Sequence, residues 1–173
     1  FISDWSSDVC SSDLEGRMKS AYYLATVVSS YRHLIDLIYQ QGYVSDQQLK
    51  DIQFEIAKAE NRQTGPGFYQ GIPGYQVQLY QDHDETVTQE YVASVLAVDD
   101  ESVLLQVKNK FTLDDELEIF GPHTLSTDIS LTGITDENDL PLVVCNKPMQ
   151  KVKTYWQGPK EVGAMIRKRR KKI

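Results

Sequence analysis

The hexapeptide Glu15-Gly16-Arg17-Met18-Lys19-Ser20 holds the side chains of this sequence that are best suited to chemistry. It stands directly before an apolar helical stretch, and a glycine-containing turn that opens a helix brings backbone N–H groups and cations to one place, where an anion can bind. Arg17 can bind a carboxylate through two parallel hydrogen bonds, and Lys19 adds a point charge. We therefore expect an anion site in which Glu15 orients Arg17 or acts as a base. A structural ion pair between Glu15 and Arg17 is an equally weighted alternative.

Cations also occur after the second predicted helix and at the end of the sequence. Arg62 could reach a ligand, although an interaction with the carboxyl end of a helix is the favoured interpretation. The final run comprises Arg167, Lys168, Arg169, Arg170, Lys171 and Lys172. Six adjacent cations would bind RNA phosphates without sequence preference, but a solvated, disordered end is slightly favoured, because the rest of the domain is acidic. Three aromatic side chains could stack on bases, although packing explains them more simply: Tyr75, Tyr155 and Trp156.

Motifs of the common hydrolases are missing from the sequence. It holds no His-Glu-x-x-His zinc motif, and its three histidines lack the spacing of metal ligands. It also holds no Gly-x-Ser-x-Gly turn of a serine hydrolase. Cys145 lies in an apolar strand pattern, which favours a buried thiol over a nucleophile. Acidic pairs such as Asp99 and Asp100 lie in predicted turns, where solvated carboxylates are expected.

The segment Asp4–Leu14 resembles a one-frame translation of a common sequencing adapter. A natural leader rich in Ser and Asp is the disfavoured alternative, and we expect residues 1–14 to be non-native. The formal charge of −7 includes three aspartates of this segment, so the remainder carries −4. Without Cys10, only Cys145 remains, which permits no internal disulfide and indicates a reducing, cytoplasmic location. No apolar run reaches the roughly 18 residues of a membrane span, so no membrane partner is expected.

The first third of the remaining sequence is helical in pattern. Apolar residues recur at spacings of three and four between Ala21 and Ile38, with Gly42 as a natural stop. Ser45 and Gln48 form a plausible capping box for a second amphipathic helix. Gly and Pro near Thr64 and Gly71 then indicate linkers and turns.

Beyond Tyr75 the pattern is that of short strands. Tyr91–Val98 and Val103–Val107 flank an acidic turn and predict a hairpin. Further short apolar stretches follow, at Leu117–Phe120, around Ile129 to Ile134, at Leu142–Cys145 and at Lys151–Tyr155. About six such strands are typical of a small barrel or sandwich.

An ordered set of short motifs from Glu15 onward resembles the C-terminal part of the bacterial collagenase-like peptidase family U32. The set begins with the hexapeptide and covers essentially the whole remaining sequence. Its other members include Tyr31-Arg32, Arg62, Gly67-Phe68-Tyr69, Asn109-Lys110-Phe111, Glu116 to Pro122, Asn146-Lys147-Pro148-Met149-Gln150 and Met165-Ile166-Arg167-Lys168.

The resemblance implies an α+β fragment of a longer protein. Residues 15–63 would be the remnant of a (βα)₈ TIM-type barrel, with Ala21–Ile38 as its last helix and a linker helix after it. Residues 64–166 would form a small all-β barrel that resembles domain II of elongation factors, and residues 167–173 a basic tail. Active sites of such barrels lie at the carboxyl ends of the strands, where the hexapeptide would fall. If the gene instead begins at Met18, a stand-alone β-barrel with a helical arm is expected.

Family members also resemble RNA-modifying proteins, one branch being tied to hydroxylation of the tRNA wobble uridine with prephenate. Prephenate is a dicarboxylate, so the resemblance implies tRNA as a partner and Arg17, Lys19 and Arg62 as substrate-binding residues. Relatives carry an iron–sulfur cluster on cysteines that would lie upstream, and none is expected in this chain. The alternatives are a collagenase-like peptidase and a noncatalytic RNA-binding module. The chain alone should be inactive, and its exposed barrel helix should favour self-association.

Overall fold

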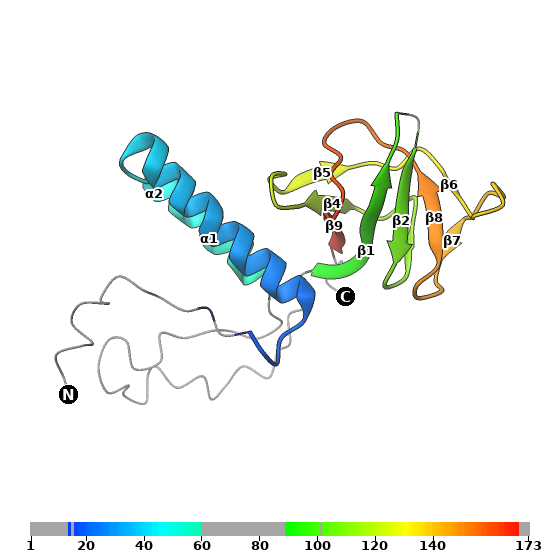
Figure 1. The fold of residues 1–173 in the computed structure, drawn as a ribbon, viewed down its shortest axis with the longest axis horizontal. Coiled ribbons are helices and arrows are strands. Elements are labelled where there is room, and N and C mark those ends of the chain that lie inside the picture. Colours follow the sequence, from blue (N-terminus) through cyan, green and yellow to red (C-terminus); the bar gives the residue numbers. More distant parts are fainter. Residues whose placement is uncertain (1–13, 15, 60–88, 101, 170–173) are drawn as a thin grey trace.

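The structure is a computed structural model that describes residues 14, 16–59, 89–100 and 102–169. Within these ranges a helical hairpin lies beside a curled β-sheet (Figure 1). Helix α1 spans Ala21–Gln41 and α2 spans Asp46–Ala57. The predicted boundary near Thr64, the aromatic Tyr75, and the site candidates Glu15, Arg62, Arg170, Lys171 and Lys172 lie outside the described residues.

Local chemistry sets the ends of both helices. The Ser20 hydroxyl accepts a hydrogen bond from the Tyr23 N–H at the start of α1, and Gly42 ends it with a φ of 75°, the left-handed conformation that glycine adopts without steric cost. The predicted capping box of α2 is confirmed, because Ser45 and Gln48 each bind the other's backbone N–H. The hairpin therefore forms where the sequence predicts it, although α1 runs three residues past Ile38.

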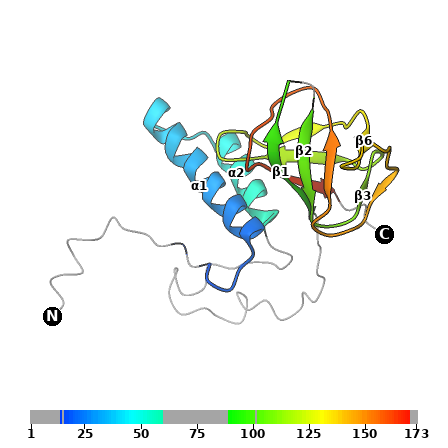
Figure 2. The same cartoon turned by 45° about the vertical axis from the view of Figure 1, so that its right-hand side comes forward.

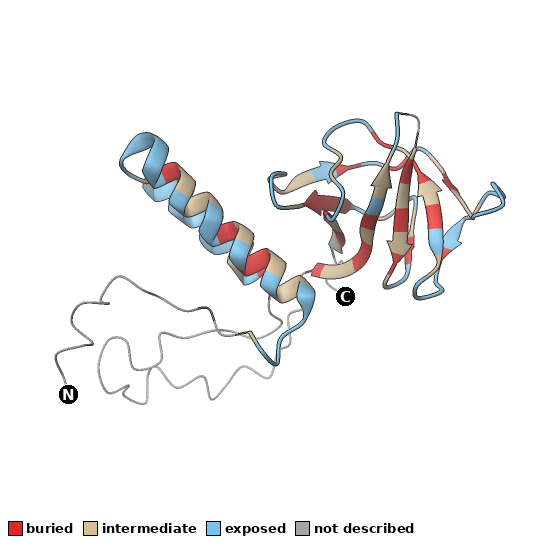
Figure 3. Ribbon diagram, in the orientation of Figure 1, coloured by how far each residue is buried: buried red, intermediate tan, exposed pale blue. Residues whose placement is uncertain are grey.

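Helix α1 packs through a different face from the one its apolar spacing suggests. Thr26, Val27, Ser30 and Leu37 are buried. The more apolar face remains exposed, and its large residues are Leu24, Val28, Tyr31, Ile35 and Ile38. Figure 3 shows how buried and exposed residues are distributed along this helix. The helix is thus half-exposed, as expected, while its place in a TIM-type barrel stays a prediction.

Nine strands follow the helices in the described part of the chain. They are β1 Gln89–Val98, β2 Val103–Val107, β3 Phe111–Thr112, β4 Leu117–Phe120, β5 Thr127–Ile129, β6 Ile134–Thr135, β7 Val144–Cys145, β8 Lys151–Thr154 and β9 Met165–Arg169. Seven form one antiparallel sheet in the order β5-β4-β9-β1-β2-β8-β6, while β3 and β7 form a separate ribbon.

The large sheet curls into a partly open barrel. Its two edge strands, β5 and β6, are consecutive in the chain and are joined by only four residues, so the two edges must lie near each other. No ladder joins them among the described residues. Register shifts in β1 between Tyr91 and Ala93, and between Val95 and Ala97, mark irregularities of the kind that bend a strand.

Strand β9 corrects the predicted architecture. Residues 167–169 were expected to begin a basic tail, but they complete a strand that pairs with both β1 and β4. The burial of this strand supports the placement, since Ile166 and Arg167 are both fully buried. Trp156 is also fully buried and donates a hydrogen bond from its indole N–H to the Pro159 carbonyl at 2.9 Å. The packing interpretation of Trp156 is thus confirmed.

No helix in the described part of the chain has the length and hydropathy needed to cross a membrane.

Candidate functional site

Residues 16–20 of the hexapeptide form a largely exposed turn that leads into α1. The Lys19 N–H binds the Gly16 carbonyl at 2.9 Å, and Ser20 caps the helix. A Cβ added at position 16 would lie 2.2 Å from Cδ2 of Leu24, so the Leu24 side chain would have to shift to admit a side chain there. Arg17 and Lys19 are both exposed, and the Lys19 ammonium lies 4.8 Å from the centre of the Tyr23 ring. Gly16 thus lies close to the Leu24 side chain of α1.

The structure places Arg167 in the interior. Its side chain is fully buried, so the expectation of a solvated cation is wrong for this residue. Its Nε donates to Glu118 on β4 at 2.7 Å, and its Nη2 donates to Glu55 on α2 at 2.5 Å and to Ser126 at 2.9 Å. The guanidinium also lies 4.5 Å from the centre of the Phe120 ring. A cation assigned to the tail therefore joins the sheet to the helices.

Lys58 completes this buried cluster of charges. Its ammonium, at the end of α2, donates to Glu118 at 2.9 Å and also pairs with Glu55. Ser126 donates to the same Glu118 carboxylate. We call Glu55, Lys58, Glu118, Ser126 and Arg167 the interdomain cluster. Two carboxylates face two cations in it, so the buried charges are balanced.

The surroundings fix the ionisation of Glu118. Burial alone would raise the pKa of its carboxyl, but the hydrogen bonds and charge of Arg167, with Ser126 and Lys58, lower this pKa to about 2. Burial likewise opposes the charge of Arg167, yet its carboxylate partners raise the guanidinium pKa above its usual value. Both groups are therefore charged throughout the physiological pH range.

Tyr22 of α1 makes a second connection beside the cluster. Its ring stacks on Tyr91 of β1, with ring centres 5.6 Å apart, and meets Phe120 edge-on at 5.8 Å. Its hydroxyl donates to the Lys58 carbonyl at 3.0 Å. Burial is the main cause of the raised pKa of this phenol. Aromatic and charged contacts thus hold the hairpin to the sheet together.

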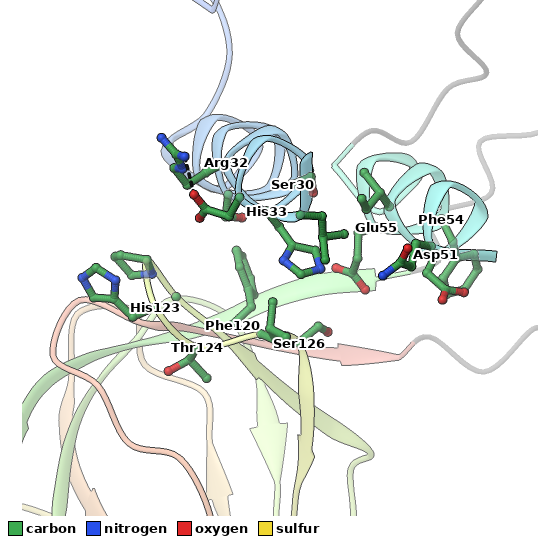
Figure 4. Close-up of a pocket in the computed structure, with 18 of the residues that line it drawn as sticks. Ser30, Arg32, His33, Asp51, Phe54, Glu55, Phe120, His123, Thr124 and Ser126 are labelled. Atoms are coloured by element: carbon green, nitrogen blue, oxygen red, sulfur yellow. Dashed lines mark hydrogen bonds and ion pairs between the residues drawn. The ribbon is translucent and has the colours of Figure 1, made fainter. Parts of the chain in front are cut away.

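A cleft of about 620 Å³ lies between the two helices and the segment from β4 to Ser126. In Figure 4, His33 projects from α1 toward the sheet, and Phe120 lies on the opposite wall. His123 and Thr124 line the same wall, and their backbone N–H and hydroxyl groups donate to Glu161. Glu55, Lys58, Glu118 and Ser126 of the interdomain cluster also line this cleft.

The cleft offers polar groups but no arrangement typical of a nucleophile with its base. His33 and His123 lie on opposite walls, and Arg32 is paired with Asp36 along α1. The only cysteine in the described residues, Cys145, is buried on β7, and burial raises its thiol pKa to about 11. No group of three potential metal ligands occurs in the described ranges, so these residues do not fit an iron–sulfur cluster.

The cations that flank Arg167 take up other contacts. Lys168 donates to the Lys110 carbonyl at 2.6 Å and lies 3.6 Å from Glu90. Arg169 pairs with Asp128 at 3.0 Å, and both side chains are largely exposed. Tyr155 is half-buried, with the Lys160 ammonium 4.3 Å from its ring centre. The structure thus gives Arg167, Lys168 and Arg169 separate partners, and it does not bring Arg17 and Lys19 among the residues that line the cleft.

Sequence reasoning missed the interdomain cluster, although one signal for it was present. Glu118 interrupts the strand Leu117–Phe120, in which all four residues are buried. A buried carboxylate in an apolar strand requires a cationic partner. Arg167 follows the apolar pair Met165-Ile166 and could have been proposed as the partner of Glu118. Their separation of 49 residues gives no local clue.

Comparisons with known families match both parts of the chain. The family model of peptidase family U32 matches residues 5–79, and that of the peptidase family U32 C-terminal domain matches residues 87–167. Together they span nearly all of the sequence, including both helices and the curled sheet up to Arg167. The chain belongs to the peptidase U32 family.

The names of the relatives indicate different functions. It is 38% identical over 146 residues to tRNA hydroxylation protein P1 of Bacillus subtilis (strain 168), an alignment that covers 81% of this chain and 33% of the relative. The chain thus spans about a third of the length of that protein. The crystal structure of the C-terminal domain of a putative U32 peptidase from Geobacillus thermoleovorans is 30% identical, with a TM-score of 0.44, and the match covers 47% of this chain and 93% of that domain. A selenomethionine variant of that domain matches with a TM-score of 0.43.

Proposed function

We propose that the chain is the C-terminal part of a protein that hydroxylates tRNA. The identity of 38% to tRNA hydroxylation protein P1 carries this proposal, since it extends over most of the chain. On this proposal the substrate position is the wobble uridine, and a prephenate-like dicarboxylate is the co-substrate. The activity belongs to the longer protein, and the present chain would supply tRNA contacts. A cytoplasmic location, where tRNA is modified, follows from the same proposal.

The exposed turn before α1 would supply part of the co-substrate site. Arg17 suits a bidentate contact with a carboxylate, and Lys19 suits the second carboxylate as a point charge. Glu15 would orient Arg17, and Arg62 would add a third cation. We propose that the upstream part forms a TIM-type barrel and holds any iron–sulfur cluster, because the described residues here offer no ligand set for one.

A chimera tests the proposed function. The matching third of the Bacillus subtilis protein is replaced by residues 15–173 of this chain, and the chimera is expressed in a strain that lacks the native protein. Mass spectrometry of tRNA nucleosides then measures hydroxylated uridine, which we expect to return. A second chimera with Arg17→Met and Lys19→Met should restore much less. Absence of hydroxylated uridine from a stably expressed first chimera would contradict the proposal.

A peptidase is the second candidate, because both matching family models carry that name. On this alternative the longer protein hydrolyses collagen-like peptides, with its catalytic groups outside the described residues. Gelatin cleavage by the purified longer protein would support it. Intact gelatin together with hydroxylated tRNA from the chimera would exclude it.

We also propose that the isolated chain self-associates through the exposed stripe of α1. Leu24, Val28, Tyr31, Ile35 and Ile38 alternate at spacings of four and three, which lines one seam of a helix pair. Light scattering should show a mass above that of one chain. Val28→Glu with Ile35→Glu should restore the monomer, whereas a monomeric wild-type chain would contradict this proposal.

A further inference from the structure

Two motifs far apart in the sequence meet at one end of the sheet. Asn109-Lys110-Phe111 follows β2, and Asn146 to Gln150 precedes β8, and Figure 1 shows these two strands side by side. The backbone ties them together, because Val107 donates to the Gln150 carbonyl and Met149 donates to the Val107 carbonyl, both at 2.8 Å. Phe111 is also paired in register with Cys145, which places Lys110 opposite Asn146.

This junction gathers lysines from three strands and their turns. We call them the basic end: Lys108, Lys110, Lys147, Lys151 and Lys168. Lys151 is the register partner of Gln106 on β2, and Lys168 reaches in from β9 to donate to the Lys110 carbonyl. Between Gln89 and Arg169 the sequence holds thirteen acidic residues against nine Lys and Arg. This end of the sheet is therefore rich in lysine, although the domain as a whole carries a net negative charge.

The charges of the basic end are only partly neutralised. Lys168 lies 3.6 Å from Glu90, and Lys151 lies 4.0 Å from Glu137. Lys108 has uncharged partners, Gln106 and the sulfur of Met149. Lys110 and Lys147 are exposed, and neither forms an ion pair with any described residue.

The turn that carries Lys110 is held in place before any ligand binds. Lys108 and Asn109 both donate their backbone N–H to the carbonyl of buried Val92, at 2.8 and 3.2 Å. The Asn109 side chain donates to the Tyr91 carbonyl at 2.7 Å. A fixed backbone lowers the ordering cost of binding. Beside it, Met149 is 61% exposed and offers an apolar surface to a sugar or base.

We propose that the basic end binds the phosphate backbone of RNA. Exposed lysines with few ion pairs, on rigid turns and beside polar amides, suit a polyanion whose phosphates contact several cations at once. This inference rests on the proposed function and places the tRNA contact on the folded sheet.

Binding of bulk tRNA to the full 173-residue chain tests this inference, measured by fluorescence anisotropy over a salt series. We expect Lys110→Ser with Lys147→Ser to weaken binding about tenfold at low salt and to lower the salt slope by about 1.4 to 1.8. The matched control is Lys50→Ser with Lys160→Ser, which removes the same charge elsewhere and should keep affinity within about twofold. Lys110→Arg with Lys147→Arg should bind like wild type.

Three results would overturn the inference. Equal weakening by both serine pairs would show that net charge alone attracts the RNA. Unchanged binding by the Lys110 and Lys147 variant would place the contact elsewhere. A wild-type chain that binds no tRNA would contradict the proposed interface. The proposed function is tested separately, by the level of hydroxylated uridine in the strain that expresses the chimera. Equal thermal midpoints of the variants verify that each remains folded.

Discussion

Arg167 lies on strand β9 and Lys110 on the turn after β2, and the molecule surrounds these two cations in opposite ways. Arg167 is fully buried and meets Glu118, Glu55 and Ser126. Lys110 is exposed on a turn and forms no ion pair with the described residues. Among the cations of this domain, burial and pairing therefore decide which hold the fold and which can meet a ligand.

Substitution of a buried cation and substitution of an exposed cation should therefore have different effects on stability and on binding. Removal of a buried cation leaves carboxylates without compensation, which costs stability. Removal of an exposed cation changes stability little but removes a phosphate contact. Stability and RNA affinity should thus respond to different lysines and arginines.

Arg167→Met should have the largest effect on stability. We expect a loss of about 3–5 kcal/mol in the free energy of unfolding, because Glu118 stays buried with only Lys58 to balance it. Urea denaturation followed by circular dichroism measures this loss. Arg169→Met is the matched control, since its pair with Asp128 is exposed and should be worth less than about 1 kcal/mol. Similar losses of stability for both variants would show that the buried and the exposed arginine stabilise the fold equally.

Acid should weaken the same cluster. The pKa of Glu118 is about 2 in the folded chain and near 4.3 when unfolded, so its contribution is complete above pH 4.3 and falls as pH drops toward 2. The loss is on the order of 3 kcal/mol. Urea midpoints measured between pH 6 and pH 2.5 should therefore fall more steeply for wild type than for Glu118→Gln. Parallel curves would contradict the low pKa.

Tyr22→Phe should have a moderate effect. It keeps the stacking on Tyr91 but removes the hydrogen bond to the Lys58 carbonyl. The expected loss is about 1 kcal/mol in the free energy of unfolding. Tyr23→Phe, at the next residue of α1, serves as its control. An effect as large as that of Arg167→Met would show that the aromatic contact is the main connection.

Met149→Gly should change stability least. Met149 has a φ of 67°, which glycine adopts without the cost borne by other residues. The greater freedom of glycine in the unfolded chain offsets that gain, so we expect a change within about 0.5 kcal/mol. Its tRNA affinity should fall by less than that of the Lys110 and Lys147 variant. A large loss of stability would instead give Met149 a structural role.

Local patterns in the sequence predicted the helices better than the site. Ser20, Gly42 and the capping box of Ser45 define the helix ends through contacts within a few residues. The identity of β9 depends on contacts that lie far away in the sequence, such as that of Arg167 with Glu55 across 112 residues. A run of six adjacent cations is typical of a solvated end, and for Arg167 only its contacts with the buried carboxylates reverse that interpretation. The basic end could not be predicted from the sequence either, because its two motifs meet only in the folded sheet.

Arg167 joins the helical hairpin to the sheet through its ion pair with Glu55. A double-mutant cycle with Glu55→Gln and Arg167→Met measures this directly, since Glu55 lies on α2 and Arg167 on β9. We predict that the two changes in unfolding free energy are non-additive by about 1–2 kcal/mol. Additivity within about 0.5 kcal/mol would contradict the claim.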